Sequence, residues 1–182
     1  IHESVHTTVW IPGSVPFNES LANFVGSQGA VDFFASRVTE CRAAGGECGE
    51  NERQFAAAQR ENSFQFELAD LVDNLFASLE KLYNDPALSS EEKIARRVEI
   101  FDSTMKPFRQ RFPTLQILKD VNNADIIQLK LYLSNIWAFR ELFILRDRDW
   151  GAFMSGIREV KRRMEAEPSS DPFVVLQEIV RR

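Results

Sequence analysis

The stretch that decides the fold is residues 1–19, which read IHESVHTTVWIPGSVPFNE and hold both histidines of the 182-residue chain. His2 and His6 stand four residues apart, and Glu3 directly follows the first of them. Positions four apart lie on one face of an α-helix, so both imidazoles can reach one ion about 2.0–2.1 Å from each ring nitrogen. Glu3 is turned away from that line and is suited to hold a water on the ion, as in the H-E-x-x-H arrangement. We therefore predict a metal site with His2 and His6 as ligands and Glu3 as the general base.

A second helix is predicted to begin near Phe17 and to carry another carboxylate, Glu19. Phe17 belongs to an apolar stripe of this helix, whereas Glu19 shares a stripe with small residues such as Gly26. Small side chains allow a second helix to approach closely. If that helix carries His2 and His6, the ion gains two imidazoles and one carboxylate and keeps a fourth position for water. The expected cofactor is one Zn²⁺ ion, held as in a catalytic zinc site.

These motifs carry a resemblance to known metallopeptidases. H-E-x-x-H followed by N-E-x-x-A resembles the gluzincins, in which a glutamate on a later helix is the third zinc ligand. The stretch 6–26 is more closely similar to the family of predicted bacterial aminopeptidases, as is 122–143, so the resemblance spans most of the chain. It implies zinc-dependent hydrolysis of a peptide substrate, with His2, His6 and Glu19 on the ion. It also makes Tyr132 a candidate hydrogen-bond donor to the oxyanion that develops during the reaction.

Other interpretations of the same residues stay open. The alternative for the motif itself is a surface-exposed pair of histidines on a frayed helix. The competing function is a helical interaction or scaffold domain that keeps a zinc-binding motif without activity. Periodicity is met equally well by a Tyr132 that fills the core. The resemblance also has two departures, because Asp125 stands where it implies a basic residue and the segment before Asn122 is short.

The composition predicts one compact, mainly helical domain. Hydrophobic residues make up 44% of the chain, and fifteen phenylalanines supply material for a core. The net charge of −5 and the dispersed basic residues give no footprint for nucleic acid. No run of about 18 apolar residues is present, so we expect no transmembrane segment.

The position of the motif raises a further expectation. Only Ile1 precedes His2, whereas short isolated helices are marginal in water. We therefore expect the chain to be the helical, C-terminal half of a gluzincin-like domain, and the resemblance places a substrate-binding sheet upstream. The expected setting is the periplasm or cell envelope. Cys41 and Cys48 flank a Gly-Gly turn and could close a disulfide suited to that setting, although two free thiols fit the spacing equally well.

Hydrophobic periodicity, capping residues and Gly or Pro breaks place the remaining elements. We predict helices over about 17–44, 51–84, 90–110, 124–145, 150–165 and 171–180. The last begins with an Asp171 cap and with Pro172 in the first turn. Strand structure is expected at most over 9–11.

Overall fold

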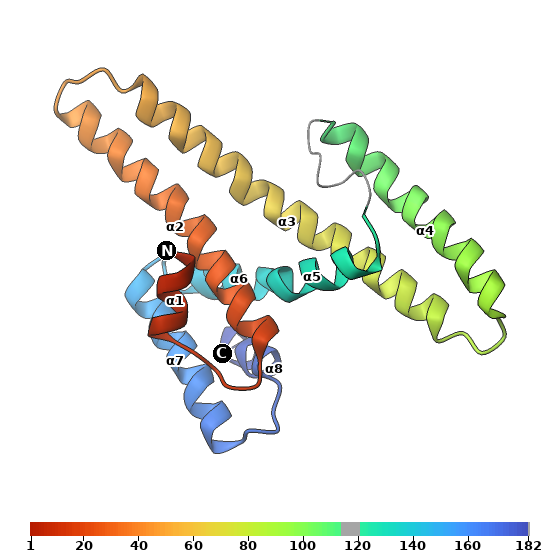
Figure 1. The fold of residues 1–182 in the computed structure, drawn as a ribbon. Coiled ribbons are helices and arrows are strands. Elements are labelled where there is room, and N and C mark those ends of the chain that lie inside the picture. The colour runs from red at the N-terminus through yellow and green to blue at the C-terminus, as the bar shows by residue number, and fades with distance from the viewer. Residues whose placement is uncertain (114–120, 182) are drawn as a thin grey trace. The chain divides into compact units, whose positions relative to one another are not determined.

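The structure is a computed structural model that describes residues 1–113 and 121–181, and the elements it describes are helices (Figure 1). In chain order they are α1 (His2–Thr8), α2 (Val15–Ala43), α3 (Gly49–Tyr83), α4 (Ser90–Arg111), α5 (Asn123–Leu133), α6 (Ile136–Leu145), α7 (Trp150–Ala166) and α8 (Pro172–Val180). No strand occurs within these described ranges, so the mainly helical fold class is confirmed. The helices in the described part of the chain include none with an apolar stretch long enough to cross a lipid bilayer.

The chain divides into two compact units. Unit 1 comprises Ile1–Glu67 and Leu131–Arg182, and unit 2 comprises Leu68–Lys130. The expectation of a single domain stays a prediction. All residues predicted for the metal site belong to unit 1.

The core of unit 1 joins α2 to the C-terminal helices α6, α7 and α8. Rings from three of these helices meet at Phe24, which lies 6.2 Å from Phe139 and 5.6 Å from Phe153 between ring centroids. Gly156 of α7 faces Leu142 of α6 so closely that an added Cβ would lie 3.1 Å from a leucine methyl. The fully buried side chains of this core include Phe17, Leu21, Phe24, Ile136, Phe139, Leu142, Phe153, Ile157 and Leu176. Because α2 enters this core through its first turns, the position of Glu19 is fixed by the packing of its neighbours.

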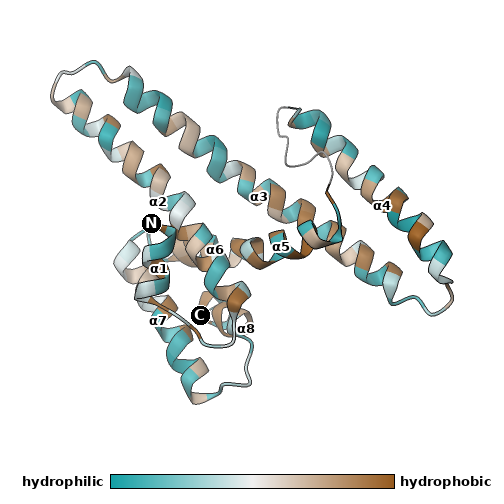
Figure 2. Ribbon diagram, in the orientation of Figure 1, coloured by the Kyte–Doolittle hydropathy of each residue, from teal (hydrophilic) through white to brown (hydrophobic). Residues whose placement is uncertain are grey.

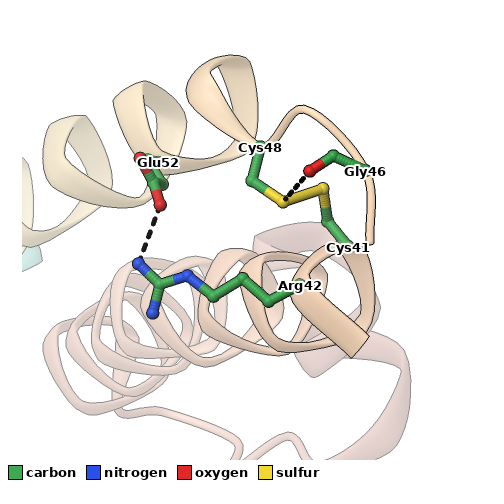
Figure 3. Close-up of a disulfide and its surroundings, with 5 residues drawn as sticks. All are labelled: Cys41, Arg42, Gly46, Cys48 and Glu52. Carbon is green, nitrogen blue, oxygen red and sulfur yellow. Dashed lines mark hydrogen bonds and ion pairs between the residues drawn. A yellow bond between two sulfur atoms is a disulfide. The ribbon is translucent and has the colours of Figure 1, made fainter. Parts of the chain in front are cut away.

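The connection between α2 and α3 is closed by a disulfide between Cys41 and Cys48 (Figure 3). Gly45 has a φ of +69°, the left-handed conformation that glycine adopts at little cost at the end of a helix. Beside the disulfide, a 2.7 Å ion pair between Arg42 and Glu52 joins the two helices (Figure 3). Of the two alternatives that the cysteine spacing leaves open, the structure contains the disulfide.

The apolar run 124–145 forms two helices, so the prediction of a single helix is wrong. α5 ends at Leu133 and α6 begins at Ile136. Between them Asn135 has φ +50° and ψ +29°, the left-handed conformation that asparagine tolerates better than most residues. The break permits α6 to pack on α2 and α8. The sequence hides it, since no glycine or proline interrupts the run.

The connector 9–11, the one place where the sequence allowed a strand, is not a strand. Val9 has an extended conformation, with φ −140° and ψ 128°, but no neighbouring strand pairs with it in the described chain. The backbone N–H and C=O of Ile11 instead bond to a side chain of α2. Side-chain hydrogen bonds thus satisfy the groups that a sheet would have paired.

Unit 2 contains the second part of α3, all of α4 and most of α5. Apolar and polar residues alternate around α3 and α4, as expected for amphipathic helices (Figure 2). α4 begins with a capping box, in which Ser89 accepts from the Glu92 N–H and the Glu92 side chain accepts from the Ser89 N–H. Asp125 accepts a 2.9 Å hydrogen bond from the Asn122 N–H. The short segment before Asn122 noted in the sequence falls on residues 114–120 and lies outside the described residues.

Candidate metal centre

α1 is a seven-residue helix that is held in place by α2. Val5 turns into the interior and is only 5% exposed. On α2, Gly26 lies next to α1, and a Cβ added there would be in ordinary van der Waals contact with the His2 Cβ, at 3.7 Å. This is the close approach that the small residues around Glu19 predict. A helix this short is marginal by itself, so its packing on α2 is what presents its histidines in a fixed geometry.

The two histidines of α1 converge on Glu19 of α2. The Nε2 atoms of His2 and His6 are 3.3 Å apart. His2 Nε2 lies 3.3 Å from Glu19 Oε2, and His6 Nε2 lies 3.5 Å from Glu19 Oε1. In the part of the chain that the structure describes, these three side chains form the one group of at least three His, Cys, Asp or Glu residues close enough to share an ion.

The cluster is partly enclosed and is open on one side. The side chains are 30% exposed for His2, 18% for His6 and 17% for Glu19. The exposed pair on a frayed helix that the sequence left open does not describe these histidines. The Nδ1 atom of His6 is buried and has no hydrogen-bond partner among the described residues. Because Nε2 of His6 faces His2 and Glu19, a neutral His6 imidazole that binds an ion through Nε2 would carry its proton on the buried Nδ1.

Asn18 fixes the connector between α1 and α2. Its side-chain amide accepts a 2.9 Å bond from the Ile11 N–H and donates a 2.8 Å bond to the Ile11 C=O. Asn18 is 1% exposed, and Ile11 is equally buried. The asparagine of the N-E-x-x-A motif therefore holds the chain entering α2 while the next residue faces the histidines. Asn18 belongs to the N-E-x-x-A motif, but the sequence alone assigns it no role.

The two proposed catalytic side chains are placed differently. Glu3 is exposed, and within residues 1–113 and 121–181 its carboxylate has no hydrogen bond or ion pair. Tyr132 is 39% exposed, and its ring centroid lies 6.3 Å from that of His2. The core-filling alternative for Tyr132 is therefore wrong.

α2 also holds the backbone that carries Tyr132. Ser20 donates a 3.2 Å hydrogen bond to the Leu131 C=O, and Asn23 donates a 3.3 Å bond to the Tyr132 C=O. Both residues follow Glu19 within one turn or so of the same helix. The helix that supplies the carboxylate thus also sets the position of the tyrosine, a role that the local sequence does not reveal.

Two imidazoles and a carboxylate that meet between packed helices are a donor set that suits a zinc ion. A comparison with protein families agrees with the resemblance noted in the sequence. Residues 1–170 match the family described as "Putative aminopeptidase", and the chain belongs to that family. Neither a curated protein nor a solved structure matches the chain. Membership confirms the aminopeptidase part of the resemblance and indicates a peptidase, while the gluzincin features stay a prediction.

Proposed function

We propose that this protein hydrolyses peptide bonds with one zinc ion held by His2, His6 and Glu19. Family membership supports the reaction class, and the geometry of the three side chains supports the cofactor. Two neutral imidazole nitrogens and a carboxylate oxygen are the ligands of many catalytic zinc sites, which leave a fourth position for water or substrate.

The observation that carries the proposal is the spacing of the donor atoms. The corners of a tetrahedron about an ion with ligands at 2.0–2.1 Å lie about 3.3 to 3.4 Å apart. Here the two Nε2 atoms lie 3.3 Å apart, Glu19 Oε2 lies 3.3 Å from His2 Nε2, and Glu19 Oε1 lies 3.5 Å from His6 Nε2. One donor atom from each of the three residues lies within 4.8 Å of the other two, which is close enough for all three side chains to share one ion.

The roles of the chain's own residues follow from this arrangement. A bound zinc ion supplies a water of pKa near 7 and polarises a carbonyl oxygen. Glu3, next to a ligand but outside the cluster, accepts the proton of the attacking water and passes it to the leaving amine. Tyr132, beside His2, offers its hydroxyl to the oxyanion that develops on the substrate.

We further propose that the protein works in an oxidising compartment such as the periplasm or cell envelope. The disulfide between Cys41 and Cys48 supports this setting, since structural disulfides persist where thiols are not kept reduced. Mass spectrometry of non-reduced peptides from the native host tests it. Two alkylatable thiols in the protein recovered there would contradict it.

Metal analysis of the full-length protein tests the zinc site. Protein purified without chelator is expected to hold about one equivalent of zinc, and Glu19→Ala to lose it, because two imidazoles alone bind zinc weakly. Glu40→Ala removes another glutamate of α2, one whose side chain is 63% exposed, and is the matched control that keeps the metal. Less than about a tenth of an equivalent of any transition metal in the wild type would contradict the proposed zinc site.

A comparison of peptidase activity between the wild type and a Glu3 variant distinguishes an enzyme from a scaffold domain. Glu3→Gln keeps the size of the side chain and removes its basicity, so zinc content is expected to survive. Activity on short peptides is expected to fall by roughly 10² to 10⁴, the usual contribution of a positioned acid or base. Equal activity of Glu3→Gln with zinc bound would disprove the mechanism. A zinc-loaded wild type that cleaves nothing in a broad peptide panel would favour the scaffold alternative.

A further inference from the structure

An exposed aromatic ring lies against the cluster on the side of His6. The ring of Trp10 meets that of His6 edge to face, with 5.5 Å between centroids. Trp10 is 41% exposed, and no acceptor for its indole N–H is found in the described residues. On the other side of the cluster, Tyr132 lies beside His2. The histidines are therefore flanked by two accessible aromatic rings.

Trp10 is held rigidly although its side chain is exposed. Its neighbours Val9 and Ile11 are 2% and 1% exposed, and the extended connector places successive side chains on opposite sides. Asn18 fixes the backbone of Ile11 from both its N–H and its C=O. Burial of the two neighbours thus forces Trp10 outward, and its ring comes to lie against the imidazole of His6.

We propose that Trp10 is the wall of a substrate subsite, which takes an apolar or aromatic side chain of the peptide residue next to the cleaved bond. The inference rests on the proposed function, since it assigns substrate preference to the same site. An indole offers a large apolar surface at small cost in conformational entropy, and its N–H can donate to a peptide carbonyl. The Glu19 carboxylate faces the histidines, whereas the exposed ring of Trp10 beside His6 is an apolar surface that a substrate side chain can contact.

Substrate selectivity of Trp10→Ala tests the assignment. For peptides with Leu or Phe at the varied position, kcat/KM is expected to fall roughly 10- to 200-fold, the range that apolar pocket contacts provide. For the matching Gly peptides the loss is expected to be no more than about threefold. Trp10→Phe should keep most of the preference, and zinc content should be unchanged in both variants. Phe33→Ala, which truncates a 55% exposed aromatic residue farther along α2, is the matched control. It should leave kcat/KM unchanged both for the Leu and Phe peptides and for the Gly peptides.

A binding measurement keeps the test independent of catalysis. The indole N–H resonance of Trp10, assigned by its loss in Trp10→Phe, is expected to shift when leucine-containing peptide amides are added to the zinc-free protein. The matching glycine peptide amides should shift it much less. An unchanged Leu-to-Gly selectivity ratio in active Trp10→Ala would overturn the subsite. So would a Trp10 resonance that no peptide moves, whereas absence of zinc or of cleavage bears on the proposed function alone.

Discussion

Asn18 shows how one buried residue can organise a site that it does not enter. Its amide satisfies both backbone groups of Ile11, which is 1% exposed and has no strand partner within the described residues. This pair of hydrogen bonds joins the connector that carries Trp10 to the first turn of α2. The residue before the predicted ligand Glu19 is therefore structural, and the two roles stand side by side in the sequence.

Asn18→Ala is expected to destabilise the protein by about 2 to 4 kcal/mol, because it leaves a buried N–H and a buried C=O without partners. Denaturant unfolding measures the loss as a lower midpoint with an unchanged slope. Asn18→Asp keeps the acceptor for the Ile11 N–H and loses the donor to the C=O, so an intermediate loss is expected. A change below about 0.5 kcal/mol for Asn18→Ala would show that the connector does not depend on this residue.

At the scale of single residues, the sequence predicts the candidate metal ligands better than it predicts the hydrogen bonds that hold the site in place. His2, His6 and Glu19 could be named because their chemical types and helical spacing are local properties of the chain. The hydrogen bonds of Asn23 and Ser20 to the backbone of 131–132 could not, since they join residues more than a hundred positions apart. The structure brings the predicted ligands together, and their function as ligands stays a prediction.

Helix starts that are marked by capping residues could be predicted from the sequence. The break between α5 and α6, which no glycine or proline marks, could not. α8 begins at Pro172, and Asp171 accepts from the Phe173 N–H, as the sequence indicates. α4 begins at Ser90 after its capping box. The break between α5 and α6 has a left-handed Asn135, and α6 packs on α2 and α8 beyond it. Periodicity alone continues through such a residue because the apolar pattern on both sides is unbroken.

The disulfide at the end of α2 is expected to contribute to stability and not to the metal site. Replacing both Cys41 and Cys48 with serine should lower the free energy of unfolding by roughly 2 to 3 kcal/mol, the loop-closure value for so short a ring. Cys41 follows Glu19 by about 22 residues of one helix, a rise of about 33 Å, so zinc content should not change. Thermal unfolding with and without reductant checks this. Reductant should destabilise the wild type and leave the double variant unaffected, and loss of zinc from that variant would contradict the separation.

At the scale of the whole molecule, the division into two units determines how metal binding can be detected. The donor atoms of His2, His6 and Glu19 all belong to unit 1. So do the chain's three tryptophans, Trp10, Trp137 and Trp150. Tryptophan fluorescence therefore reports on the unit that carries the site, whereas far-ultraviolet circular dichroism reports on the helices of both units.

Zinc is expected to stabilise unit 1 by mass action, because the three donors come together only in the folded state. At free zinc about 100-fold above its dissociation constant, the gain is about 2.7 kcal/mol, or roughly 5 to 10 °C in the midpoint for a chain of this size. Tryptophan fluorescence should show the full shift, chelator should reverse it, and His6→Ala should abolish it. Glu3→Gln should keep the shift, since Glu3 lies outside the ligand set. A zinc-dependent rise in the dichroism midpoint without one in tryptophan fluorescence would mean that the ion binds and stabilises some other part of the chain.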